Sequence, residues 1–189
     1  MYPEIMEHFL SKEAIVEHLS YYNNLRLGYS ILEKSIPGIA MKSPREIFKM
    51  SLPREELNDI LPYIINLKSH YLYFSSFVGV GAPIPQIKGY YSSEEDFIYR
   101  VYTAAKNAVG GFLFVGVDRA GIPSLETVYP FERALPKIRP ALCIDMQEHA
   151  YFSDYGFNCE GYLKNLLPYL NLAAVFSEER LKLYLDTPI

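Results

Sequence analysis

The chain has 189 residues, of which 50% are hydrophobic and 21% are charged, so it is long enough for one or two domains and too apolar for an intrinsically disordered protein. A formal net charge of −4, without a run of Lys and Arg, argues against nucleic acid as a partner. The sequence has no apolar run of about 18 residues and no signal-peptide pattern, so we expect a cytoplasmic protein without a membrane partner.

The N-terminal part of the chain has a helical pattern. Ser11 is a good N-cap, and apolar side chains recur at mostly helical spacing over residues 10–33. Pro and Gly residues then interrupt the pattern, and a short helix is expected over 44–50. A further helical start is expected at 51–53, where Ser and Pro precede an acidic turn.

A strongly apolar helix should follow and continue to residue 79, with a kink or a new start at Pro62. Long helices separated by loops predict an antiparallel helical hairpin. The stretch 79–85 is rich in Gly and Pro, and the sequence pattern changes after it. We therefore expect two domains, a helical hairpin domain at 1–80 and an α+β domain at 81–189.

The second part of the chain mixes strands with helices. Ser92 or Ser93 should cap a helix that runs to about residue 108. Three strands are expected at 112–117, 124–129 and 139–144, the first two forming an antiparallel pair. Helices are expected at 160–172 and 177–185, with a break at Asn171. The order of elements predicts an α+β fold with a three-stranded antiparallel sheet.

Asp145 follows the third expected strand, and His149 lies four residues later. If the chain turns helical here, both side chains reach toward one point, where a carboxylate and a neutral imidazole can bind a first-row transition metal. A surface ion pair or a capped turn is the alternative interpretation of the same spacing.

The sequence from Asp145 to Tyr151, which reads Asp-Met-Gln-Glu-His-Ala-Tyr, resembles the C-terminal signature of the iron/manganese superoxide dismutase family. Two further segments resemble ligand-bearing helices of that family. Residues 10–18 end in His18, and residues 69–74 contain His70. The resemblance implies an α+β fold and four metal ligands, which are His18, His70, Asp145 and His149. It also implies one iron or manganese ion per chain.

The surroundings of these ligands depart from the family pattern. Tyr22, Asn23 and Arg26 occupy positions that carry paired histidines and a gateway tyrosine in the family. Three aromatic walls that are usually Trp correspond to Phe74, Phe112 and Phe114. Arg26 either attracts a small anion to the mouth of the site or is an ordinary solvated charge.

The family also uses an amide side chain beside the metal. Asn66 or Gln147 is expected to supply it, since either can donate and accept hydrogen bonds. The resemblance implies that Glu148 contacts a second subunit, so we expect a two-fold homodimer.

The resemblance predicts an oxidoreductase that converts superoxide to dioxygen and hydrogen peroxide. Three alternatives remain. The first is a non-catalytic or repurposed metal-binding homodimer of the same fold, because residues around the ligands are altered. The second is a different metal chemistry, such as an oxygen-activating iron site. The third is a purely structural helical protein without metal.

Overall fold

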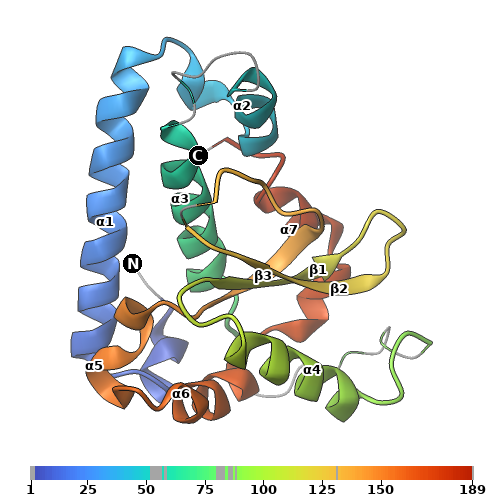
Figure 1. Cartoon of the computed structure of the whole chain (residues 1–189). Helices are drawn as coiled ribbons and strands as arrows, with labels where there is room; N and C mark the ends of the chain where they lie inside the picture. The colour runs from blue at the N-terminus through green and yellow to red at the C-terminus, as the bar shows by residue number, and fades with distance from the viewer. Residues whose placement is uncertain are drawn as a thin grey trace.

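The computed structural model describes residues 3–51, 57, 59–79, 84, 87, 89–130 and 132–188. Its N-terminal part is helical, and its C-terminal part combines a small sheet with further helices (Figure 1). This is the α+β arrangement predicted from the sequence. The expected boundary near residue 80 lies in a stretch outside the described residues, so the division into domains stays a prediction.

The helical hairpin consists of α1 (Lys12–Ser35) and α3 (Ile60–Phe74), which run antiparallel and side by side (Figure 1). The side chain of Ser11 accepts a hydrogen bond from the backbone N–H of Ala14 at 3.1 Å, as expected for an N-cap. Most side chains of α3 are buried. This helix therefore lies between α1 on one side and the sheet on the other.

Pro62 lies in the first turn of α3, which confirms the new start expected there. A proline is tolerated at this place because the first N–H groups of a helix have no partner within it. The expected end at residue 79 is wrong, because α3 ends at Phe74. The following segment is extended instead, with Phe77 bridging to Leu170 and the N–H of Val78 donating to the carbonyl of Tyr169 at 2.8 Å.

Short helices flank the hairpin. The 3₁₀ helix η1 (Glu4–His8) precedes α1, and η2 (Ile39–Met41) follows it. The expected short helix is present as α2 (Pro44–Ser51). A further helical start was expected at 51–53. Of these residues, 52 and 53 lie outside the described part of the chain.

The sheet contains β1 (Phe112–Val117), β2 (Pro123–Val128) and β3 (Arg139–Asp145) in the order β2-β1-β3, with both pairs antiparallel. Every residue of the central strand β1 is buried. The preceding helix α4 (Glu94–Lys106) begins after Ser93, whose side chain accepts from the N–H of Asp96. Ser93 is thus the cap, and Ser92 binds the Asp96 carboxylate instead.

The C-terminal segment is more broken than predicted. After η5 (Glu148–Ala150) and α5 (Phe152–Tyr155), two short helices replace the expected helix at 160–172, and a third begins at its end. They are α6 (Cys159–Leu166), η6 (Leu167–Tyr169) and η7 (Leu172–Phe176). Pro168 lies at the start of η6, where its missing N–H prevents α6 from continuing. The break at Asn171 is confirmed, and α7 (Glu178–Leu183) begins after Ser177 as expected.

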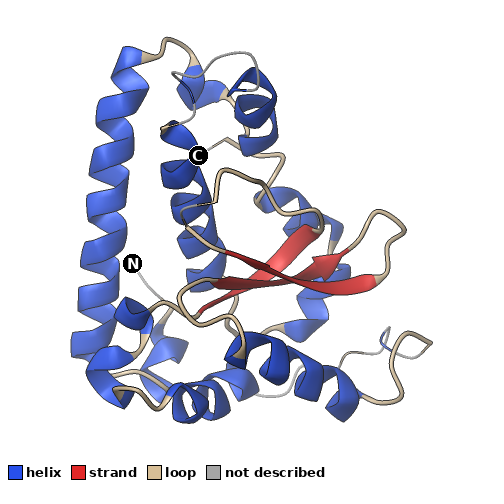
Figure 2. Cartoon of the chain, in the orientation of Figure 1, coloured by secondary structure: helices blue, strands red, loops and turns tan. Residues whose placement is uncertain are grey.

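One large hydrophobic core lies between α3 and the sheet, with helices closing around it (Figure 2). A smaller cluster joins α1, α2 and the first half of α3. None of the described helices combines the length and the apolar character that crossing a bilayer requires. The larger core surrounds the end of β3, and this is where the predicted ligand Asp145 lies.

Candidate metal centre

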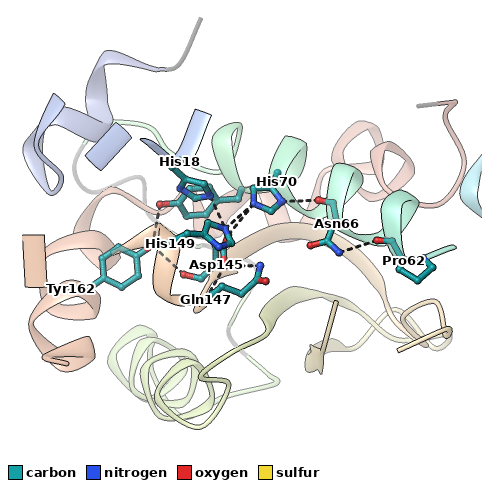
Figure 3. Close-up of polar contacts among 9 residues, drawn as sticks. His18, Pro62, Asn66, His70, Asp145, Gln147, His149 and Tyr162 are labelled. Carbon is teal, nitrogen blue, oxygen red and sulfur yellow. Dashed lines mark hydrogen bonds and ion pairs between the residues drawn. The ribbon is translucent and has the colours of Figure 1, made fainter. Parts of the chain in front are cut away.

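The four predicted ligands come from four different elements and meet at one place (Figure 3). His18 lies on α1, His70 on α3, Asp145 at the end of β3 and His149 in η5. His18, His70 and Asp145 are completely buried, and the side chain of His149 is 24% exposed. The cluster therefore lies inside the protein with its open side at His149.

Three imidazole nitrogens surround one carboxylate oxygen. The Oδ2 atom of Asp145 lies 3.2 Å from His18 Nε2, 3.4 Å from His70 Nε2 and 3.3 Å from His149 Nε2. One possible ligand atom from each of the four residues can be chosen so that all lie within 4.8 Å of one another. Ligands bound at roughly 2.1 Å to one ion, at angles between 90° and 110°, are roughly 3.0–3.4 Å apart, so this spacing suits a single metal ion.

The local structure that joins Asp145 to His149 is not the helix considered from the sequence. Asp145 is the last residue of β3, and the chain then forms the single 3₁₀ turn that carries His149. The N–H of Gln147 donates to Asp145 Oδ1 at 2.9 Å and holds the corner between the two. The side chains converge because the chain reverses at this corner, rather than because they share one helix face.

A backbone contact fixes the orientation of His70. Its Nδ1 donates to the carbonyl of Asn66, one helical turn earlier, at 2.8 Å. The lone pair of Nε2 therefore faces Asp145, as a metal ligand requires. Burial lowers the pKa of His70 to about 3 and also lowers the pKa of His18, so both rings are neutral at pH 7.

Asp145 is a buried carboxylate beside the neutral rings of His18 and His70. Burial by itself raises the pKa of its carboxyl, but interactions with His149, His18 and His70 outweigh burial and hold the pKa well below its usual range. Its Oδ1 accepts from the backbone N–H and the side-chain amide of Gln147, the latter at 3.3 Å. A carboxylate that stays charged in the interior needs a cation to balance it.

Several buried atoms of the cluster lack hydrogen bonds among the described residues. They are both ring nitrogens of His18 and Oδ2 of Asp145. Unpaired buried polar atoms are costly, and a bound cation would satisfy the two that face the centre of the cluster. Three imidazoles with one carboxylate are also a donor set suited to first-row transition metals such as iron and manganese. The residues therefore fit such an ion.

Residues 81–178, just over half of the chain, match the family described as iron/manganese superoxide dismutases, C-terminal domain. The chain belongs to the iron/manganese superoxide dismutase family. No curated protein matches the chain significantly. The family match covers Asp145 and His149, and the hairpin that carries His18 and His70 lies before it. The helical hairpin followed by an α+β part fits the superoxide dismutase fold.

Two of the three expected aromatic walls contact the histidines. The ring of Phe74 lies 4.9 Å from that of His18, and the ring of Phe112 lies 5.3 Å from that of His70, edge to face. The ring of Phe114 stacks on that of Phe112 with centroids 6.4 Å apart, so Phe114 packs against Phe112 on the side away from His70. The positions that this superoxide dismutase family usually fills with Trp therefore still form an apolar enclosure.

Residues around the ligands that sequence reasoning missed are tyrosines. Tyr21 stacks on His149 with centroids 3.9 Å apart and planes at 24°. Tyr73 lies against His18, and its hydroxyl contacts that of Tyr162. Tyr162 in turn donates to the carbonyl of Asp145 at 3.2 Å (Figure 3). Tyr21 lies three residues after His18, a spacing that places both on one face of α1 and gave a usable signal. Nothing in the local sequence pointed to Tyr162.

The two candidate amides have different orientations (Figure 3). The side-chain amide of Asn66 donates to the carbonyl of Pro62 within its own helix at 2.9 Å. The amide of Gln147 instead contacts Asp145 directly. The geometry thus favours Gln147 as the amide that acts on the ligands.

Tyr22 lies beside the cluster, and Arg26 lies one helical turn further along α1. The ring of Tyr22 stacks on that of His70 at 5.9 Å. Both residues line a pocket of about 500 Å³ between α1 and α3, together with Asn23. Within the described part of the chain, the guanidinium of Arg26 forms no ion pair, so its charge is available to a ligand.

The buried histidine predicts a pH dependence of stability. In the unfolded chain His70 binds a proton near pH 6.5, whereas the folded protein binds it near pH 3. Because the unfolded state then holds more protons, the free energy of unfolding of the metal-free protein should fall by roughly 2–4 kcal/mol as the pH drops from 6.5 to 3. Urea unfolding at several pH values measures this. His70→Gln should reduce the dependence of the free energy of unfolding on pH, whereas His8→Gln, at an exposed position, should not. Equal pH dependence in the two variants would contradict the attribution of this effect to His70.

Proposed function

We propose that the protein is a superoxide dismutase whose iron or manganese ion is held by His18, His70, Asp145 and His149. The observation that carries the proposal is the convergence of three imidazole nitrogens on one buried, charged carboxylate oxygen. The ion would supply one-electron chemistry between its +3 and +2 states, oxidising one superoxide to dioxygen and reducing the next to hydrogen peroxide.

The protein's own residues set the conditions for that chemistry. The negative charge of Asp145 favours the higher oxidation state, and the neutral imidazoles allow the lower one. Gln147 donates to Asp145 Oδ1 and so reduces the electron density that this carboxylate offers. Phe74 and Phe112 exclude water from the histidines on two sides.

Arg26 provides the attraction for an anionic substrate. It lies at the pocket between α1 and α3, next to the Tyr22 ring that covers His70. A cation without an acidic partner at the mouth of a concave site raises the local concentration of small anions. The expectation from the sequence that Arg26 attracts an anion is therefore the interpretation we favour.

The test is superoxide dismutation by protein reconstituted separately with iron and with manganese, with His70→Ala as the control. Activity with one metal that disappears in the variant supports the proposal and names the metal. If both forms bind one ion per chain but neither turns over, the proposed activity is wrong and the site only binds metal.

The second candidate function is a non-catalytic or repurposed metal-binding homodimer. The observation that favours it is the set of altered neighbours, since Tyr22 and Arg26 stand where the family has a histidine and a tyrosine. Glu148 is exposed beside His149, so it is free to contact a second subunit as the family resemblance implies. The oligomeric state follows from light scattering with and without metal.

The side-chain amide of Gln147 provides a sharper test of turnover. Gln147→Leu removes the side-chain donor to Asp145 but keeps the backbone donor, so the metal should stay bound while activity falls about 10- to 100-fold. Asn66→Leu is the matched control, because among the described residues its amide donates only to Pro62, and its backbone carbonyl still orients His70. Steady-state rates and metal content measure both variants. Equal losses in the two variants would contradict a special role of Gln147.

A further inference from the structure

A second pocket, distant from the metal cluster, is surrounded by positive charge. It has a volume of about 390 Å³ and lies at the start of β3, whereas Asp145 lies at its end. Five of the chain's 18 Lys and Arg residues line it: Arg45, Lys49, Arg119, Lys137 and Arg139. No acidic side chain lines it among the described residues. Such a concentration of cations is unexpected in a chain with a net charge of −4.

Three separate parts of the chain bring these residues together. Arg45 and Lys49 are four apart on α2 and share one helix face. Lys137 and Arg139 flank the buried Ile138 at the start of β3, so their side chains point away from the core. Arg119 follows β1, whose last residue pairs with Arg139.

Most of this charge is not neutralised. Arg45 pairs with Asp186 at 2.9 Å, and Arg139 pairs with Glu178 at 2.7 Å. The side chains of the other three cations, Lys49, Arg119 and Lys137, form no ion pair within the described ranges. Five cations less two paired acids leave three positive charges around one pocket, and the carboxylate of Glu126 beside Lys137 offsets them in part.

The other five lining residues are apolar, and we call them the apolar floor. They are Phe48, Leu135, Pro136, Ile138 and Leu185. The backbone of the segment that carries Lys137 is held in place by Glu126. The N–H groups of Lys137 and Ile138 both donate to its carboxylate, at 2.7 and 3.1 Å. An apolar floor with a cationic rim fits a ligand that has a ring system at one end and several negative charges at the other.

We propose that this pocket binds a nucleoside di- or triphosphate. Its phosphates would contact Lys49, Arg119 and Lys137, since lysine and arginine bind phosphate through charge-assisted hydrogen bonds. Its base would lie against Phe48 and the apolar floor. An inorganic anion would leave that floor uncovered, and a long nucleic acid would be repelled by the acidic remainder of the surface. The proposal does not depend on the metal or on the proposed dismutase activity.

The test is fluorescence anisotropy with fluorescently labelled ADP at low salt, on the full-length metal-loaded protein. The variant Arg119→Gln with Lys137→Gln should weaken binding at least about 10-fold. The matched control is Lys34→Gln with Lys164→Gln, which changes the net charge equally at exposed positions outside the pocket and should change binding less than about 2-fold.

Competition identifies the ligand. Unlabelled ADP should displace the probe at lower concentration than pyrophosphate, because only ADP covers the apolar floor. Absence of saturable binding, or equal weakening in the two double variants, would overturn the proposal. Equal competition by pyrophosphate would show that the pocket binds anions in general. Stronger competition by a short oligonucleotide would show that it binds nucleic acid. Either result would also overturn the proposal.

Discussion

Replacing Asp145 with Asn should lower the affinity for iron or manganese at least about 100-fold and should also destabilise the metal-free protein. The carboxylate is the only anionic ligand, so its loss removes most of the electrostatic attraction for the ion. In the absence of metal the ionised carboxylate still stabilises the fold, because its interactions with His149, His18 and His70 hold its pKa well below the usual range. The amide of Asn keeps an acceptor for Gln147 and offers a donor to the lone pair of His70 Nε2.

Metal titration and urea unfolding, each with and without metal, measure the two effects. The metal-free variant should be less stable than the unchanged protein by about 1.5–3 kcal/mol. Asp59→Asn is the control, because Asp59 has an 80% exposed side chain in a surface ion pair, where the change should be about 0.5 kcal/mol or less. Tight metal binding by the Asp145 variant, or a metal-free form as stable as the unchanged protein, would refute the assignment of Asp145 as a metal ligand.

Gly116→Ala should destabilise the protein by about 3 kcal/mol, since it places a methyl group inside the sheet. A Cβ at Gly116 would lie 2.0 Å from the carbonyl oxygen of Arg139 and 2.9 Å from the Cα of Pro140. Both neighbours are backbone atoms of β3, so they can move only if the strand moves. The register between β1 and β3 already shifts at this point, between Val115 and Gly116.

The displacement of β3 should also reach Asp145 at its other end, so the affinity for metal should fall together with the free energy of unfolding. Gly79→Ala is the matched control, because no described residue lies within 4 Å of the added methyl group and Gly79 has no positive φ. Urea unfolding and metal titration of both variants provide the measurement. A loss below about 1 kcal/mol for Gly116→Ala would mean that the two strands separate easily.

Local sequence signals predicted most of the fold. Ser11 caps the helix for which it was proposed, Ser93 is the cap of the two serines considered, and the alternation of turns and apolar runs located all three strands. The end of α3 was missed because Phe77 pairs with Leu170, and such a long-range pairing leaves no mark on the helical pattern of residues 60–79.

The ligand cluster was predicted through the family resemblance, and its convergence in space agrees with that prediction. Its surroundings were less accessible. Sequence left Asn66 and Gln147 as equal candidates, and only side-chain orientation distinguishes them. The basic pocket was missed altogether, because its five cations are spread over residues 45 to 139 and form no cluster along the chain.

The origin of the four ligands in distant parts of the chain has a consequence for biosynthesis. His18 and His70 leave the ribosome long before Asp145 and His149 do, so the growing chain has an incomplete ligand set for most of its synthesis. Two imidazoles without the carboxylate bind iron or manganese weakly. The ion should therefore enter only after the third strand has been made and docked on the hairpin. Metal supply in the cell then acts at the last step of maturation, on a chain that is already folded.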